Sequence, residues 1–218
     1  MDRKVRLIIF DLDNTLFPFD DLWLKANKNT FKEYTLFKGI NYNDFMTLYR
    51  KYDLYFWEQH DAGIITLDEL RELRLIKTLK HFDLNISHKE ANKYFQTFFA
   101  NLLSSITVNK KMNDLLLSLK ENVNIAILTN GKDEEQNIKI DNLDVRSIFG
   151  ENIFISQNTG YEKPDSQAFL NVTSKMYIPP EECLFIGDSL KNDILGALDV
   201  NMSAIWSVSY THLRAHET

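Results

Sequence analysis

The chain has 218 residues, of which 44% are hydrophobic and 26% charged, a balance that excludes a mainly disordered or collagen-like protein. Only 7 Gly and 4 Pro occur, which argues against an all-β fold of many short hairpins and favours long helices. The net charge is −6, whereas proteins that bind nucleic-acid polymers usually carry a basic balance, so we expect no such partner.

Cysteine usage and hydropathy indicate a cytoplasmic protein. The single cysteine, Cys183, cannot form an intrachain disulfide, which suits a reducing compartment. The apolar run Leu7–Phe10 near the N-terminus is too short for the core of a signal peptide. No apolar run approaches the roughly 18 residues that a membrane helix needs, so we expect no membrane partner.

Short apolar runs bounded by polar residues predict buried parallel strands. In chain order these runs are Val5–Phe10, Val123–Leu128, Asn152–Ile155, Cys183–Ile186 and Ala204–Val208. Apolar residues at helical spacing lie between the later runs, in the sets Met112, Leu115, Leu116, Leu119 and Ala168, Phe169, Val172, Met176. Alternating strands and helices predict an α/β fold with a doubly wound (Rossmann-like) parallel sheet.

Residues 17–108 interrupt this alternation and predict an all-helical domain inserted after the first strand. Aromatic and aliphatic residues follow helical faces there, in the sets Phe45, Leu48, Tyr49, Tyr52, Phe56 and Ala91, Tyr94, Phe95, Phe98, Phe99, Leu102. Capping boxes at Thr66–Glu69 and Ser87–Glu90 predict the starts of two helices. We therefore expect a discontinuous α/β core, residues 1–16 and 109–207, and a helical cap, residues 17–108.

Two acids, Asp11 and Asp13, follow directly on the first predicted strand. Residues i and i+2 of a strand point to the same side, so both carboxylates should project together where the chain leaves the sheet. In open α/β sheets, ligands bind at this edge. For so short a motif the alternative is a helix N-cap beside a solvated acid.

Other polar segments follow the later strands. Thr129-Asn130-Gly131 follows the second predicted strand, and Gly187-Asp188 through Asn192-Asp193 follows the fourth. Between them Lys163-Pro164-Asp165 opens a predicted helix, with Pro in its first turn. Parallel strands end at one edge, which should gather four acids and a lysine: Asp11, Asp13, Asp188, Asp193 and Lys163.

Such a cluster has a defined chemistry. Four acids repel one another unless a cation is present, and oxygen ligands without Cys or His favour Mg²⁺. Lys163 and the N–H groups near Gly131 would then hold an anionic group. The edge is thus predicted to bind a magnesium ion and an anion together.

In order and character these segments resemble the four motifs of the haloacid dehalogenase (HAD) superfamily. The resemblance covers Val5 to about Trp206 and includes a helical cap inserted after the first motif. It implies a phosphatase in which Asp11 is the nucleophile, forming an aspartyl-phosphate, and Asp13 is the general acid and base.

The resemblance also implies the binding residues. The ligands of Mg²⁺ would be the carboxylate of Asp11, the backbone carbonyl of Asp13 and Asp188, with Asp193 close by or acting through water. The phosphoryl oxygens would be bound by Thr129, the backbone of Gly131 and Lys163, with Asn130 beside them.

Asp13 separates branches of this superfamily, because the dehalogenases lack an acid at this position and the ATP-driven pumps carry Thr. The chain therefore resembles phosphatases and phosphomutases that act on small phosphorylated metabolites. Further details resemble bacterial 5′-nucleotidases of the noncanonical-pyrimidine type: Leu16–Asp20, Trp57, Gly63–Thr66, Gln136 and Lys139. Sugar-phosphate and phosphoglycolate phosphatases share several of them, and a non-catalytic HAD-like binding protein is the alternative of a different class.

Aromatic residues near the first motif are candidates for substrate selection. Phe17, Phe19 and Trp57 could stack on a nucleobase, although a place in the cap's own core is the alternative. Residues 208–218 show neither a helical stripe nor strand alternation and are expected to be a non-native or disordered tail. We expect a monomer or a homodimer.

Overall fold

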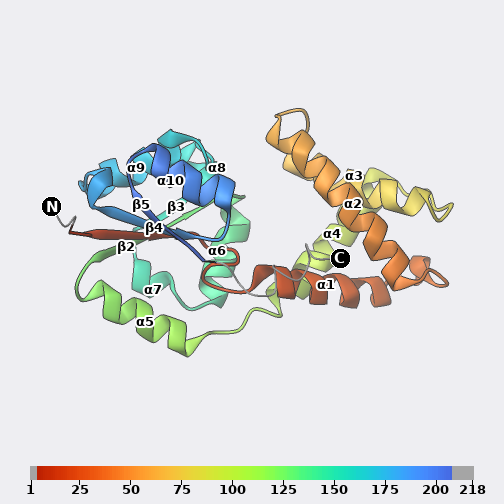
Figure 1. Cartoon of the computed structure of the whole chain (residues 1–218). Helices are drawn as coiled ribbons and strands as arrows, with labels where there is room; N and C mark the ends of the chain where they lie inside the picture. The colour runs from red at the N-terminus through yellow and green to blue at the C-terminus, as the bar shows by residue number, and fades with distance from the viewer. Residues whose placement is uncertain (1–3, 208–218) are drawn as a thin grey trace. The chain divides into compact units, whose positions relative to one another are not determined.

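A computed structural model describes residues 4–207 of the chain. The chain divides into two compact units, the first containing residues up to Asp20 and from Ile106 onward, and the second Asp21–Ser105. The chain therefore enters and leaves the second unit once (Figure 1). The predicted tail, residues 208–218, lies outside the described residues.

A parallel sheet with the strand order β3-β2-β1-β4-β5 forms the centre of the first unit. Its strands are β1 (Leu7–Phe10), β2 (Asn124–Thr129), β3 (Ile153–Ile155), β4 (Cys183–Gly187) and β5 (Ser203–Trp206). All five predicted runs become strands, so the doubly wound α/β class is confirmed. Because β1 lies between β2 and β4, the segments after these three strands meet at one edge.

Helices cover both faces of this sheet. In Figure 1, α5 (Lys110–Lys120) and α7 (Arg146–Phe149) lie on one face, and α9 (Ser166–Met176) and α10 (Gly196–Asp199) on the other. The remaining elements of the unit are α6 (Asp133–Asn142), α8 (Ser156–Thr159), the 3₁₀-helix η2 (Pro180–Glu182) and the π-helix η3 (Leu190–Leu195). Apolar residues of α9 join the buried core formed by the strands.

The predicted apolar face of α5 needs one correction. Leu116 is fully buried, and Met112 and Leu119 are partly buried beside it, but Leu115 is 53% exposed. Met112, Leu116 and Leu119 form one row along the helix, whereas Leu115 lies on the flank of that row. The helix was predicted correctly, and the buried row on it leaves out Leu115.

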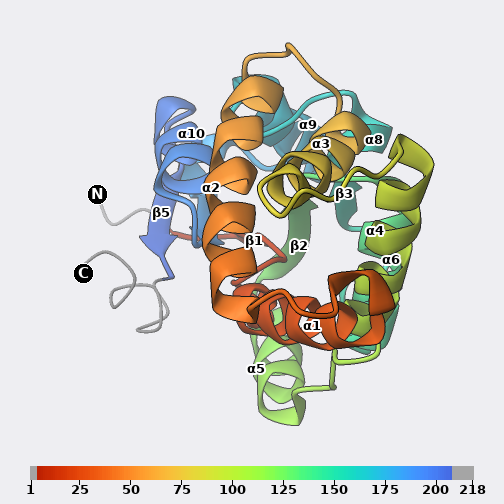
Figure 2. The ribbon, with the colours of Figure 1, turned by 90° about the vertical axis from the view of Figure 1, so that its right-hand side faces the viewer.

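The second unit contains α1 from Asp21 onward, and all the regular elements that the structure describes there are helical. They are α1 (Phe19–Glu33), the 3₁₀-helix η1 (Thr35–Phe37), α2 (Tyr42–Asp61), α3 (Leu67–Lys80) and α4 (His88–Leu103). Figure 2 shows α3 between α2 and α4. Thr66 and Ser87 cap α3 and α4, and each accepts the N3 backbone N–H in a complete capping box. Among the helices of the described residues, none has the length and apolar character required to span a bilayer.

Candidate active site

The loop after β1 fixes the first acid at the edge of the sheet. The backbone N–H of Asp11 donates to the carbonyl of Ile186 at 2.9 Å, which continues the pairing of β1 with β4 by one residue. The chain then turns tightly, since Asn14 adopts the left-handed conformation (φ 60°) and Leu16 N–H donates to Leu12 O at 3.0 Å. Asp11 is only 6% exposed, so its carboxylate is held in a largely water-free place.

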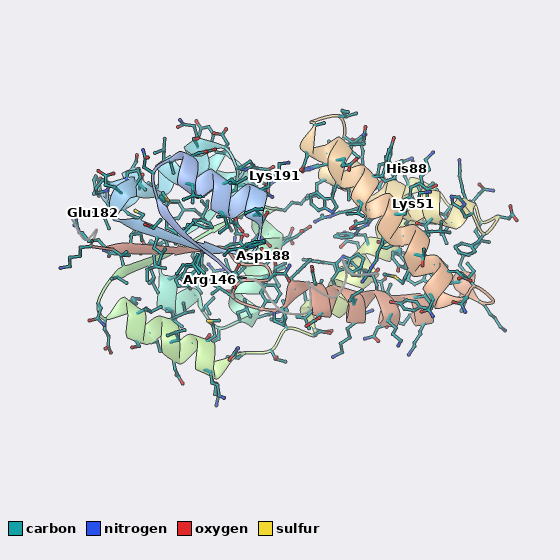
Figure 3. All side chains as sticks on the ribbon, in the orientation of Figure 1. Lys51, His88, Arg146, Glu182, Asp188 and Lys191 are labelled. Atoms are coloured by element: carbon teal, nitrogen blue, oxygen red, sulfur yellow. The ribbon has the colours of Figure 1, made fainter. Side chains whose placement is uncertain are left out.

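Lys163 joins two of the predicted acids. Its ammonium donates to Asp11 Oδ1 at 2.6 Å and to Asp193 Oδ1 at 2.7 Å, and all three side chains are buried. The other oxygen of Asp193 accepts the backbone N–H of Ser189 at 3.0 Å. Asp188 lies at the carboxyl end of β4, where Figure 3 labels it. One oxygen from each of Asp11, Asp188 and Asp193 lies within 4.8 Å of the others.

The electrostatics of this cluster indicate a shortage of positive charge. Burial raises the pKa of Asp11 to about 7, with repulsion from Asp193 adding to the shift and Lys163 opposing it. Burial also raises the pKa of Asp188 to about 6, with a further contribution from Asp193. A cation bound between these carboxylates would relieve both effects. Three converging carboxylates without a Cys or His ligand fit Mg²⁺.

The end of β2 and the two residues after it are hydrogen-bonded to neighbouring segments, including the loop that carries Lys163. Asn130 Oδ1 accepts the backbone N–H of Lys163 at 2.9 Å, and Asn130 Nδ2 donates to the carbonyl of Lys163 at 2.8 Å. The N–H of Gly131 donates to Ser156 Oγ at 3.0 Å, and Thr129 Oγ1 accepts from Gln136 at 2.7 Å. The structure thus joins Asn130 to Lys163, while contacts of Thr129, Asn130 and Gly131 with a phosphate stay a prediction.

Two residues of α6 belong to the site although they were predicted only as part of the nucleotidase resemblance. Lys139 donates to both carboxylate oxygens of Asp13, at 2.9 and 2.8 Å. Gln136 donates to Asn130 O at 2.9 Å, in addition to Thr129. Residues at i and i+3 share a helix face, and the adjoining apolar Ile140 marks that face as buried. This pattern was the available signal in the sequence.

The predicted selectivity residues differ in their surroundings. Phe17 is buried and packs edge-on against Phe19, with 6.2 Å between ring centroids. The ring of Phe19 lies 4.7 Å from the ammonium of Lys139. Trp57 belongs to the helical unit, is 42% exposed and contacts His60 edge-on. A role of any of the three in substrate selection stays a prediction.

Pro164 is placed differently from the prediction. Helix α9 begins at Ser166, and Asp165 caps it by accepting the N–H of Gln167 at 2.8 Å. Pro164 therefore precedes the cap, and its predicted place in the first helical turn is wrong. Because the Asp165 side chain satisfies an N–H of the first turn, it takes the capping position ahead of the helix.

Comparison with known proteins decides the family. A family model described as haloacid dehalogenase-like hydrolase matches residues 5–201. The chain belongs to this family. This HAD chain is 25% identical over 201 residues to pyrimidine 5′-nucleotidase YjjG of Escherichia coli, covering 91% of this chain and 84% of that protein. The predicted resemblance to HAD hydrolases and to pyrimidine 5′-nucleotidases is thereby confirmed.

This HAD hydrolase is also similar to a phosphatase and to a hydrolase of known structure. It is 28% identical over 214 residues to glyceraldehyde 3-phosphate phosphatase of Pyrococcus furiosus, covering 94% of this chain and 81% of that protein. The crystal structure of magnesium-bound HAD-hydrolase YfnB from Bacillus subtilis superposes with a TM-score of 0.79 at 24% identity, covering 93% and 86% of the two chains. That likeness shows a shared fold.

Proposed function

We propose that this HAD hydrolase is a Mg²⁺-dependent phosphatase that acts through an aspartyl-phosphate on Asp11. One observation carries the proposal: the buried carboxylate of Asp11 is held by Lys163 within 4.8 Å of the carboxylates of Asp188 and Asp193. Asp11, Asp188 and Asp193 would hold the ion, which when bound would neutralise charge on the phosphoryl group.

In the first step, a carboxylate oxygen of Asp11 attacks phosphorus and forms an acyl-phosphate bond. The bond between phosphorus and the leaving oxygen breaks, its electron pair stays on that oxygen, and Asp13 supplies the proton that makes an alcohol. In the second step, Asp13 removes a proton from a water molecule while the oxygen of that water attacks phosphorus. The bond between phosphorus and the oxygen of Asp11 breaks with its electron pair on that oxygen, so inorganic phosphate leaves and the carboxylate of Asp11 is restored.

Nucleoside monophosphates are the proposed substrates. The nucleotidase relative supports this choice. A sugar phosphate is the second candidate, and the phosphatase relative from Pyrococcus furiosus favours it. A panel of both substrate classes compared by kcat/KM separates them, since preference for sugar phosphates over every nucleotide would contradict the nucleotidase proposal.

Hydrolysis of p-nitrophenyl phosphate tests the reaction class. We expect turnover with Mg²⁺ that EDTA removes and that Asp11→Asn abolishes, whereas the exposed Asp141→Asn should retain it. A dehalogenase would release halide from a 2-haloacid instead, and a non-catalytic binding protein would show neither activity. Near-full phosphatase activity of Asp11→Asn would refute the nucleophile. The cytoplasmic location and the monomeric or dimeric state stay predictions.

A further inference from the structure

We propose that Lys139 is a positioning residue that fixes the carboxyl group of Asp13 for proton transfer. This inference rests on the proposed phosphatase function, in which Asp13 protonates the leaving oxygen. The two acids after β1 have separate lysine partners: Lys163 contacts Asp11, and Lys139 contacts Asp13. Each acid can therefore be held without competing for the other's ammonium.

The contact of Lys139 with Asp13 restricts the carboxylate closely. The ammonium lies 2.9 Å from Oδ1 and 2.8 Å from Oδ2, so both oxygens are held by one donor atom. Lys139 is 5% exposed, whereas the side chain of Asp13 is 29% exposed. The lysine is thus anchored in the protein, while the acid it holds keeps an open side from which a substrate oxygen can approach.

Neighbouring groups reinforce the anchor. The ring of Phe19 lies 4.7 Å from the ammonium, an arrangement in which its negative face attracts the cation and excludes water. Gln136, one turn earlier on α6, lies 3.4 Å from Asp13 Oδ2 and donates to Thr129. Helix α6 therefore connects Asp13 to the end of β2, and a rigid element holds the acid more accurately than a loop would.

If Lys139 positions Asp13, then replacing Lys139 should lower kcat/KM most for substrates whose leaving oxygen needs a proton. An alkoxide needs a proton as its bond to phosphorus breaks, but p-nitrophenolate leaves readily without one. The parameter kcat/KM reports the steps up to formation of the aspartyl-phosphate, before Asp13 acts as a base. A lysine that only stabilised the fold would affect both kinds of substrate equally.

The test compares Lys139→Met with wild type on p-nitrophenyl phosphate and on an alkyl phosphate. The alkyl substrate is uridine 5′-monophosphate or glycerol phosphate, whichever the wild type hydrolyses faster. We expect kcat/KM to fall about 100-fold for the alkyl phosphate and less than about 3-fold for p-nitrophenyl phosphate. Lys175→Met is the matched control, since its ammonium also lies over an aromatic ring, that of Phe154 at 5.6 Å, and it should leave both values unchanged.

A double-mutant cycle shows whether the effect passes through Asp13. In an Asp13→Ala background, Lys139→Met should cause no further loss on the alkyl phosphate, because the group it positions is absent. Equal losses on both substrates, or an undiminished loss in the Asp13→Ala background, would overturn the inference. If circular dichroism shows that Lys139→Met is unfolded, Lys139→Arg replaces it, with about a 10-fold loss expected on the alkyl phosphate alone; equal losses again refute the role.

The experiments distinguish a failure of the phosphatase proposal from a failure of the proposed role of Lys139. A wild-type protein that hydrolyses no phosphate ester with Mg²⁺ contradicts the phosphatase function itself. An active wild type whose Lys139→Met variant shows no leaving-group dependence contradicts only the role of Lys139.

Discussion

Gly187 and Asp193 approach each other so closely that no side chain fits between them. A Cβ atom added at Gly187 would lie 2.5 Å from Cγ of Asp193, far inside van der Waals contact. The absence of a side chain at the end of β4 therefore lets Asp193 reach Lys163 and the two other carboxylates. A glycine at position 187 is therefore needed to make room for the side chain of Asp193.

Gly187→Ala should displace Asp193 and lower phosphatase kcat with Mg²⁺ by about 100-fold, because the acidic cluster loses its geometry. Assays with p-nitrophenyl phosphate measure the effect. Gly150→Ala is the control: Gly150 adopts φ +59° and an added Cβ meets no atom within 4 Å, so backbone strain should lower thermal stability while folded protein keeps its activity. A Gly187→Ala variant with more than half of the wild-type activity would show that Asp193 need not sit so close.

The effect of Mg²⁺ on thermal stability should increase with pH. Asp11 and Asp188 have pKa values raised by burial to about 7 and about 6, above their unfolded values. Without metal, the stability that these two protonated acids contribute is fully present below about pH 4. It is lost as the pH rises through their pKa values of about 6 and about 7. Mg²⁺ competes with protons for the same carboxylates, so it should stabilise little near pH 5 and most near pH 8.

Thermal midpoints with and without Mg²⁺ across this range test the competition. Asp188→Asn is the comparison variant, since it removes one carboxylate and should reduce the Mg²⁺-induced shift at every pH. A shift of equal size at both ends of the range would mean that the ion does not bind at these acids.

Arg74 and Asp53 form a largely buried ion pair in the helical unit, with Nη1 of Arg74 2.5 Å from Oδ1 of Asp53. Asp53→Asn leaves the guanidinium buried without a counter-charge and should cost about 3 kcal/mol of unfolding free energy. Replacing both partners, Arg74→Met together with Asp53→Leu, removes both charges and their desolvation cost, so it should change stability by less than about 1 kcal/mol. Urea denaturation measures both, and equal losses would show instead that the pair is strongly attractive in itself.

The sheet and the acidic cluster could be predicted because both follow from local patterns and one topological rule. Each apolar run is long enough for a strand, and the ends of adjacent parallel strands must meet. Asp11 and Asp188 needed no further information to be placed together. The position of Lys163 at this edge could be predicted because its loop leads into α9, which packs on the same sheet.

Other contacts depend on how a helix is rotated when it packs, which no local pattern fixes. Lys139 reaches Asp13 only because α6 presents that face to the first loop. Leu115 was predicted on one helix face with Met112, Leu116 and Leu119, yet it lies on the exposed flank of α5. Both outcomes depend on tertiary packing, which overrides the local preference of a short segment.

The two hydrogen bonds between the side chain of Asn130 and the backbone of Lys163 join two segments from different parts of the chain. An aspartate at position 130 would lose the donor, and a leucine would lose both bonds. Because the loops cannot shift independently, a substitution that moves one displaces the groups carried by the other. A substitution in either of the segments 129–131 and 163–165 is thus expected to alter the geometry of both, so the two segments act as one structural unit.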